Sequence, residues 1–138
     1  MGNPILGVDF GKVRIGLAIG DTDLRSSMPL RVILRTNEKS DMEAVASAIR
    51  EYGGNEIVLG LPLNMNGTEG PSADEARRFA EALRTKGITV HMEDERLTTF
   101  EVLEDMRQAG ISQKKQRERL DMFAAAAILR SYFLKISR

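Results

Sequence analysis

Short apolar runs separated by turn-forming residues predict five β-strands along the chain. These runs occupy residues 5–10, 15–20, 30–34, 56–61 and 88–92. The sequence Gly-Lys-Val-Arg joins the first two runs closely, as in a hairpin. The run at 56–61 is almost wholly apolar, which is typical of a strand covered on both faces of a sheet.

Apolar residues at helical spacing predict four helices between and after these strands. The expected helices cover residues 41–52, 72–86, 98 or 99 to 108, and 116–134. Ser40 or Asp41 is the expected cap of the first helix, and Thr98 or Thr99 that of the third. Residues 62–71, Pro-Leu-Asn-Met-Asn-Gly-Thr-Glu-Gly-Pro, are expected to form a loop.

The resulting order, β-β-β-α-β-α-β-α-α, indicates an α/β fold with a five-stranded mixed sheet. Three antiparallel strands come first, parallel strands follow, and helices flank the sheet. The chain shows no internal repeat, linker or low-complexity segment, so we expect one domain over residues 1–138.

Composition narrows the class of protein. The chain has 138 residues, of which 42% are hydrophobic and 29% charged, as in a globular protein with a core of its own. It has no cysteine, which excludes disulfides and thiolate metal sites. A net charge of zero disfavours a nucleic-acid coat protein but allows an enzyme that contacts a few phosphates. We find neither a secretory signal nor a membrane-length apolar run, and therefore expect a cytoplasmic protein with no membrane partner.

One carboxylate, Asp9, interrupts the apolar run of the first strand. An acid in such a run is costly to bury unless a cation meets it, either an arginine, a lysine or a bound metal ion. Alternatively, Asp9 bonds to the amides of the hairpin or to Arg14.

Two further acidic positions are candidates to meet Asp9. Acids at 93–95 follow the last predicted strand, at the end of the sheet where ligands of α/β proteins bind. Asp121 lies on an alanine-rich helical face, and such a face can approach a sheet closely. Alternatively, Asp121 pairs with Arg117 and each acid at 93–95 is simply solvated.

Three carboxylates with few compensating bases favour a hard cation such as Mg²⁺ or Mn²⁺. Two such ions can activate a water and stabilise the leaving oxygen when a phosphodiester is cleaved. The acids therefore indicate a metal-dependent hydrolase.

Four segments together resemble the YqgF nuclease family, also called RuvX, of the RNase H-like superfamily. They are GVDFGKVRIGLA at 7–18, IVLGLPLNMNGTEG at 57–70, DERLTT at 94–99 and LDMFAAAAIL at 120–129. They follow the family's order and spacing over nearly the whole chain. The resemblance implies an RNase H-like fold, which agrees with the element order above.

The resemblance also implies roles for the acids. Asp9 is the implied first-strand metal ligand, Glu95 the second acid with Asp94 as its substitute, and Asp121 the ligand of the last helix. Related resolvases usually carry an acid at the end of the fourth strand, where this chain has Gly-Leu-Pro at 60–62. The choice between Glu95 and Asp94 therefore stays open.

Polar residues near these acids are candidates to bind the substrate's sugar-phosphate backbone. They are Lys12, Arg14, Asn64, Asn66, Gly67, Thr68 and Arg96. Alternatively, Lys12 and Arg14 are solvated turn residues, and the four residues at 64–68 belong to a plain turn-forming connection. The alternative for Arg96 is a structural ion pair.

The family's activity implies a nuclease that processes the 5′ end of pre-16S rRNA in ribosome biogenesis. Its expected partners are structured RNA and ribosomal particles. Cleavage of four-way DNA junctions, as by a Holliday junction resolvase, is the alternative, and a stable homodimer rather than a monomer would favour it. A non-catalytic nucleic-acid-binding module and a fragment of an actin-like ATPase are the remaining hypotheses.

Overall fold

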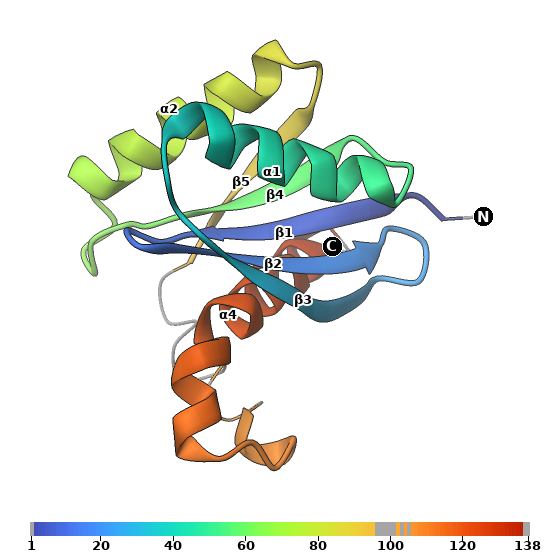
Figure 1. Cartoon of the computed structure of the whole chain (residues 1–138), viewed down its shortest axis with the longest axis vertical. Coiled ribbons are helices and arrows are strands. Elements are labelled where there is room, and N and C mark those ends of the chain that lie inside the picture. Colours follow the sequence, from blue (N-terminus) through green and yellow to red (C-terminus); the bar gives the residue numbers. More distant parts are fainter. Residues whose placement is uncertain (1, 96–101, 103, 105, 137–138) are drawn as a thin grey trace.

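The computed structural model describes residues 2–95, 102, 104 and 106–136, and its centre is a five-stranded sheet (Figure 1). The order across the sheet is β3-β2-β1-β4-β5. Strands β1, β2 and β3 pair antiparallel, whereas β4 pairs parallel with both β1 and β5. The strands are β1 Pro4–Phe10, β2 Arg14–Asp21, β3 Ser26–Leu34, β4 Glu56–Leu61 and β5 Thr89–Asp94. The expected mixed sheet is confirmed, with the strand of Asp9 at its centre.

Helices cover both faces of the sheet (Figure 1). Helices α1, Glu38–Glu51, and α2, Pro71–Thr85, lie on one face, and the long helix α4, Gln113–Ile136, crosses the other. The expected helix ending at 108 is helical at its described residues, and its start at Thr98 or Thr99 lies outside them. None of the helices among the described residues combines the length and the hydropathy of a membrane-spanning segment.

The predicted cap of α1 is wrong. Asn37 caps this helix, since its side-chain oxygen accepts a hydrogen bond from the Ser40 amide at 2.9 Å. Asp41 instead lies buried in the first turn, where it accepts from the Thr36 amide at 2.9 Å. The helix therefore begins at Glu38, earlier than the apolar spacing indicated.

Other boundaries differ by a few residues for local reasons. Strand β3 begins at Ser26, before Pro29, because an edge strand tolerates the missing N–H of a proline. Helix α2 begins at Pro71, since the fixed φ of proline suits the first helical position. Strand β5 continues to Asp94 and so includes two of the three acids expected after it.

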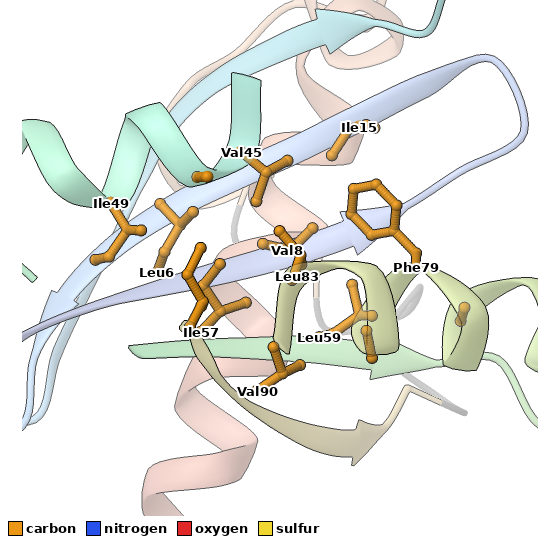
Figure 2. Packing of buried hydrophobic residues seen from close by; sticks show 14 of the residues in the cluster. Leu6, Val8, Ile15, Val45, Ile49, Ile57, Leu59, Phe79, Leu83 and Val90 are labelled. Atoms are coloured by element: carbon orange, nitrogen blue, oxygen red, sulfur yellow. The ribbon is translucent and has the colours of Figure 1, made fainter. Parts of the chain in front are cut away.

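Around the middle of β1 and β2, one face of the sheet carries large aliphatic residues and the other, the small-residue face, carries glycines and alanines. Toward α1 and α2, β1 presents Leu6 and Val8, which pack with Ile57 and Leu59 of β4 in an aliphatic core (Figure 2). Phe10 of the same strand stacks on Phe79 of α2, with ring centroids 4.2 Å apart.

On the face toward α4, glycines bring the helix backbone close to the sheet. A Cβ added to Gly7 would lie 2.6 Å from the carbonyl oxygen of Ala125. Ala18 of β2 packs against Ala125 and Ala126 of the helix. The expected close approach of an alanine-rich helix is therefore confirmed, and it determines where Asp121 lies.

Candidate active site

Asp9 lies on the small-residue face of β1, between two glycines. Successive strand residues point to opposite faces, so Asp9 shares its face with Gly7. Across the antiparallel pair its partner is Gly16 of β2. The parallel register pairs Val8 with Leu59, and one residue further along it Gly60 of β4 follows beside Asp9. Space for other side chains therefore exists on both flanks of this carboxylate.

Asp121 of α4 uses the space over Gly16. A Cβ at position 16 would overlap the backbone carbonyl of Asp121, so only glycine allows the helix to lie this close to β2. The Asp121 carboxylate accepts a hydrogen bond from Arg14 Nε, with 2.9 Å between Nε and Oδ2. Arg117, the expected alternative partner, has a side chain outside the described part of the chain.

Glu95 uses the space over Gly60. A Cβ there would come within 2.5 Å of Glu95 Oε2, and the Glu95 amide continues the β5 pairing by donating to Leu61 at 3.3 Å. The Glu95 side chain thus lies where a longer side chain at the end of β4 would project. By strand alternation, Asp94 points to the opposite face, and Glu95 is the acid that hydrogen-bonds Asp9.

The electrostatics of these acids show that they interact. Burial, the charge of Glu95, the charge of Asp121 and a hydrogen bond to Glu95 raise the pKa of Asp9 to about 8. Burial likewise raises the pKa of Glu95, although the hydrogen bond with Asp9 acts in the opposite direction. The shared hydrogen bond acts to raise the pKa of Asp9 and to lower that of Glu95, as expected when Asp9 is the donor.

This donor set fits a divalent cation. Its ligand atoms are all carboxylate oxygens, which suit Mg²⁺ or Mn²⁺, and a cation would replace the proton that Asp9 and Glu95 share. In the part of the chain that is described, no three acidic or histidine side chains already stand at metal-ligand spacing. Asp121 contacts Arg14 instead.

The loop after β4 largely satisfies its own hydrogen bonds. Asn64 Nδ2 donates to Thr68 Oγ1 at 2.9 Å, and that hydroxyl donates to Asn66 Oδ1 at 2.6 Å. Gly67 takes a positive φ of 86°, and Leu63 and Glu69 close the loop with an antiparallel bridge. These contacts are those of a turn-forming connection, so binding of substrate by the loop stays a prediction.

The other residues predicted to bind substrate, and the acids at 93–95, lie in different environments. Lys12 is exposed in the β1–β2 turn, whereas Arg14 is paired with Asp121. Arg96 lies outside the described residues. Among the acids at 93–95, the expectation of a solvated charge is wrong for Glu93, which is buried and accepts a hydrogen bond from Ser131 Oγ at 2.7 Å.

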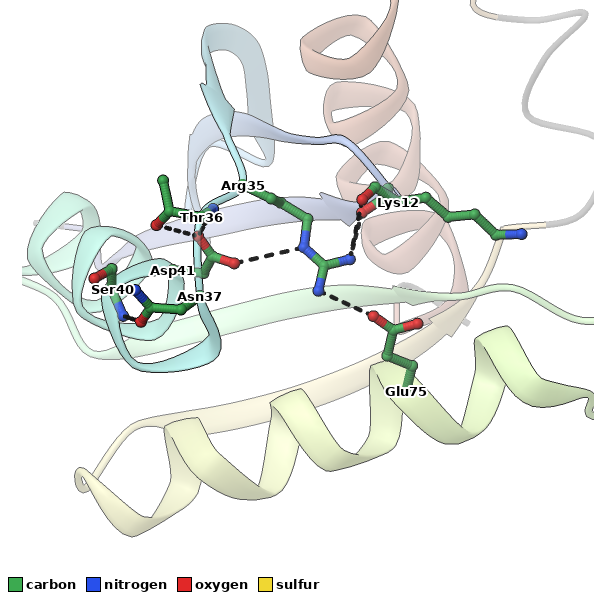
Figure 3. Close-up of polar contacts among 8 residues, drawn as sticks. Lys12, Arg35, Thr36, Asn37, Ser40, Asp41 and Glu75 are labelled. Atoms are coloured by element: carbon green, nitrogen blue, oxygen red, sulfur yellow. Dashed lines mark hydrogen bonds and ion pairs between the residues drawn. The ribbon is translucent and has the colours of Figure 1, made fainter.

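Arg35, just after β3, is a structural residue that the sequence analysis missed (Figure 3). Its Nη1 donates to the Gly11 carbonyl at 2.9 Å, its Nη2 pairs with Glu75 at 2.9 Å, and its Nε faces buried Asp41 at 3.5 Å. The guanidinium also stacks over the Phe10 ring, 4.1 Å from its centroid. Arg35 thereby ties the turn beside Asp9 to both helices of the opposite face.

Gly16 and Gly60 were also missed as determinants of the site. The sequence does contain a signal for both residues, which is a glycine in each of the two strands that flank the strand of Asp9. Recognising it required the strand order and register, which the sequence pattern alone does not supply.

Comparison with known proteins identifies relatives of this chain. A family model described as "RuvX: Holliday junction resolvase" matches residues 3–135. The chain is 46% identical over 128 residues to a protein of Anaeromyxobacter sp. (strain K) named "Putative pre-16S rRNA nuclease", covering 92% of this chain and 93% of that protein. A protein of the same name from Moorella thermoacetica is 38% identical over 135 residues, covering 97% of this chain and 96% of that one.

Solved structures share the fold at low sequence identity. T. thermophilus RuvC in complex with a Holliday junction substrate has a TM-score of 0.56 at 11% identity, covering 98% of this chain and 96% of that one. The large terminase nuclease of thermophilic phage G20c has a TM-score of 0.60 at 14% identity, covering 95% of this chain and 81% of that one. The fold is therefore that of RuvC-like resolvases and nucleases, the RNase H-like fold expected from the sequence.

Proposed function

The chain belongs to the RuvX family, and we propose that it is a metal-dependent nuclease that hydrolyses phosphodiester bonds in pre-16S rRNA. The observation that carries the proposal is the contact between Asp9 and Glu95, close enough to Asp121 for its charge to act on Asp9. Bringing two carboxyl groups into contact in a largely buried place is costly, and such clusters of acids with shifted pKa values are typical of functional sites.

In this proposal Asp9, Glu95 and Asp121 hold Mg²⁺ or Mn²⁺. When bound, the cation supplies an activated water and stabilises charge on the scissile phosphate. Asp9 is fixed by the central strand and Glu95 by the end of β5, so two ligands stand on rigid elements of the sheet. Lys12 is exposed in the turn beside Asp9, where it can meet a phosphate of the bound strand.

Pre-16S rRNA is the substrate that the names of the relatives support, with structured RNA and ribosomal particles as the partners. A four-way DNA junction is the second candidate, supported by the description of the family and by the likeness to a RuvC–junction complex. The fold does not choose between them, because nucleases of one fold act on different substrates.

A cleavage assay separates these functions. Labelled precursor 16S rRNA and a labelled four-way DNA junction are incubated with the protein in Mn²⁺, Mg²⁺ or EDTA, beside Asp9→Asn. Cation-dependent cleavage of the RNA alone, absent from the variant, supports the proposal. Cleavage of the junction alone supports the resolvase, and tight binding without cleavage supports a non-catalytic module. Wild-type rates in Asp9→Asn would refute the proposed site.

A further inference from the structure

One member of the acid cluster is already held by a cation of the protein itself. Arg14 opens β2 and its Nε donates to Asp121 Oδ2, with 2.9 Å between the two atoms. The residues are 107 positions apart, so the contact exists only because α4 is docked over β2. Arg14 is therefore a counter-ion of Asp121 that the fold itself supplies.

The position of this pair favours exchange. The Arg14 side chain is 47% exposed and that of Asp121 is 19% exposed, so the bond spans the boundary between solvent and the cluster. An ion pair this exposed contributes little to stability, and losing it costs little. Leaving Asp121 also moves no backbone, because the Gly11 amide fixes the carbonyl of Arg14 at 3.0 Å and only the side chain needs to rotate.

A metal ion and Arg14 compete for the same oxygens. Asp121 cannot offer its carboxylate fully to a cation while Arg14 holds it, and a second positive charge beside a bound cation is repelled. A guanidinium that leaves a carboxylate pairs favourably with phosphate, whose oxygens have matching geometry. A phosphate of the nucleic-acid strand is the anion that the proposed function brings to this place.

Resting on that proposed function, we infer that Arg14 is a positioning residue that exchanges partners. It holds Asp121 until the cation arrives, and then turns to a phosphate of the bound strand. Cation binding and nucleic-acid binding are thereby coupled, and each strengthens the other.

Mn²⁺ affinity, measured by calorimetry without nucleic acid, tests the first half of this exchange. Arg14→Gln is expected to bind Mn²⁺ about 2- to 5-fold more tightly than the wild type, the range that an exposed ion pair supports. Lys12→Gln is the matched control, because it removes one positive charge from the same turn but no contact with Asp121. Equal effects of the two variants, or weaker Mn²⁺ binding by a folded Arg14→Gln, would overturn the inference.

A double-mutant comparison guards against indirect effects. In an Asp121→Asn background, Arg14→Gln should no longer raise Mn²⁺ affinity, because the carboxylate that it competes for is absent. A gain that persists in that background also counts against the exchange. Thermal melts of each variant establish that the folded protein is being compared.

The second half is tested by fluorescence anisotropy with a labelled RNA duplex, in EDTA and in Mn²⁺, with a parallel gel to check that the RNA is intact. Mn²⁺ should tighten RNA binding more in the wild type than in Arg14→Gln. Equal tightening would exclude the exchange. Failure of the proposed function gives a different result. The protein would then cleave neither the RNA nor the junction, whereas Arg14→Gln would still bind Mn²⁺ more tightly than the wild type.

Discussion

The carboxylate of Glu95 lies in the space that a side chain on Gly60 would take, with Oε2 2.5 Å from the position of such a Cβ. The glycine one residue before the end of β4 and the glutamate directly after β5 are thus complementary. The acid that contacts Asp9 therefore comes from the segment directly after β5 and not from the end of β4.

Gly60→Ala tests this complementarity. The added methyl group meets both Glu95 and Ile128, at 2.5 and 2.6 Å, so we expect Glu95 to be displaced from Asp9. The variant should lose about 1–3 kcal/mol of unfolding free energy and most of its Mn²⁺ affinity. Gly70→Ala is the control, because its Cβ would make ordinary contact with Asn64 at 3.6 Å. Mn²⁺ binding equal in both variants would contradict the prediction.

The raised pKa of Asp9 predicts a pH dependence of stability in metal-free protein. The folded state binds a proton up to about pH 8, whereas the unfolded chain releases it near 3.8, so unfolding free energy should fall as pH rises between these values. Asp9→Asn should flatten this slope and be more stable than the wild type at pH 8 by on the order of a few kcal/mol. Urea unfolding at pH 5 and pH 8 measures both effects, and an unchanged slope in the variant would disprove the assignment.

Addition of a cation should offset the fall in unfolding free energy that the metal-free protein shows as the pH rises. Mn²⁺ that binds the folded state alone raises the unfolding free energy, by about 1.4 kcal/mol at ten times its Kd. Thermal melts with and without Mn²⁺ should therefore show a shift in the wild type, a smaller shift in Asp121→Asn and none in Asp9→Asn. A shift of the same size in all three proteins would mean that Mn²⁺ binds elsewhere.

Arg35→Lys tests the tie between the β1–β2 turn and the two helices. A lysine has no fork and cannot reach the Gly11 carbonyl, Asp41 and Glu75 together, which leaves buried Asp41 poorly paired. We expect a loss of about 1–3 kcal/mol in urea unfolding. Arg31→Lys, in an exposed pair with Glu51, should cost well under about 1 kcal/mol, and a similar cost for both would refute the special role of Arg35.

Most of the fold could be predicted from the sequence, because apolar runs and helical spacing directly reflect burial in a sheet and its covering helices. The central place of Asp9 and the approach of Asp121 were also predictable, since an acid in an apolar strand and an alanine-rich helical face are local signals. The cap at Asn37 was missed because three neighbouring polar residues can all cap a helix, and only the geometry decides among them.

The contacts that shape the site were harder to predict from the sequence. The Arg14–Asp121 pair joins residues at opposite ends of the chain, and the roles of Gly16 and Gly60 depend on strand register. Arg35 follows a strand as an ordinary arginine would, and its five partners come from three separate segments. No sequence pattern expresses such long-range relations.

Helix α4 contacts all five strands and carries Asp121, and it follows all of these strands in the sequence. During translation, Asp9 leaves the ribosome long before this helix does. A nascent or prematurely ended chain therefore has a bare sheet face and only part of its acid cluster. The acid cluster is therefore assembled only after α4 has been synthesised and has docked on the sheet.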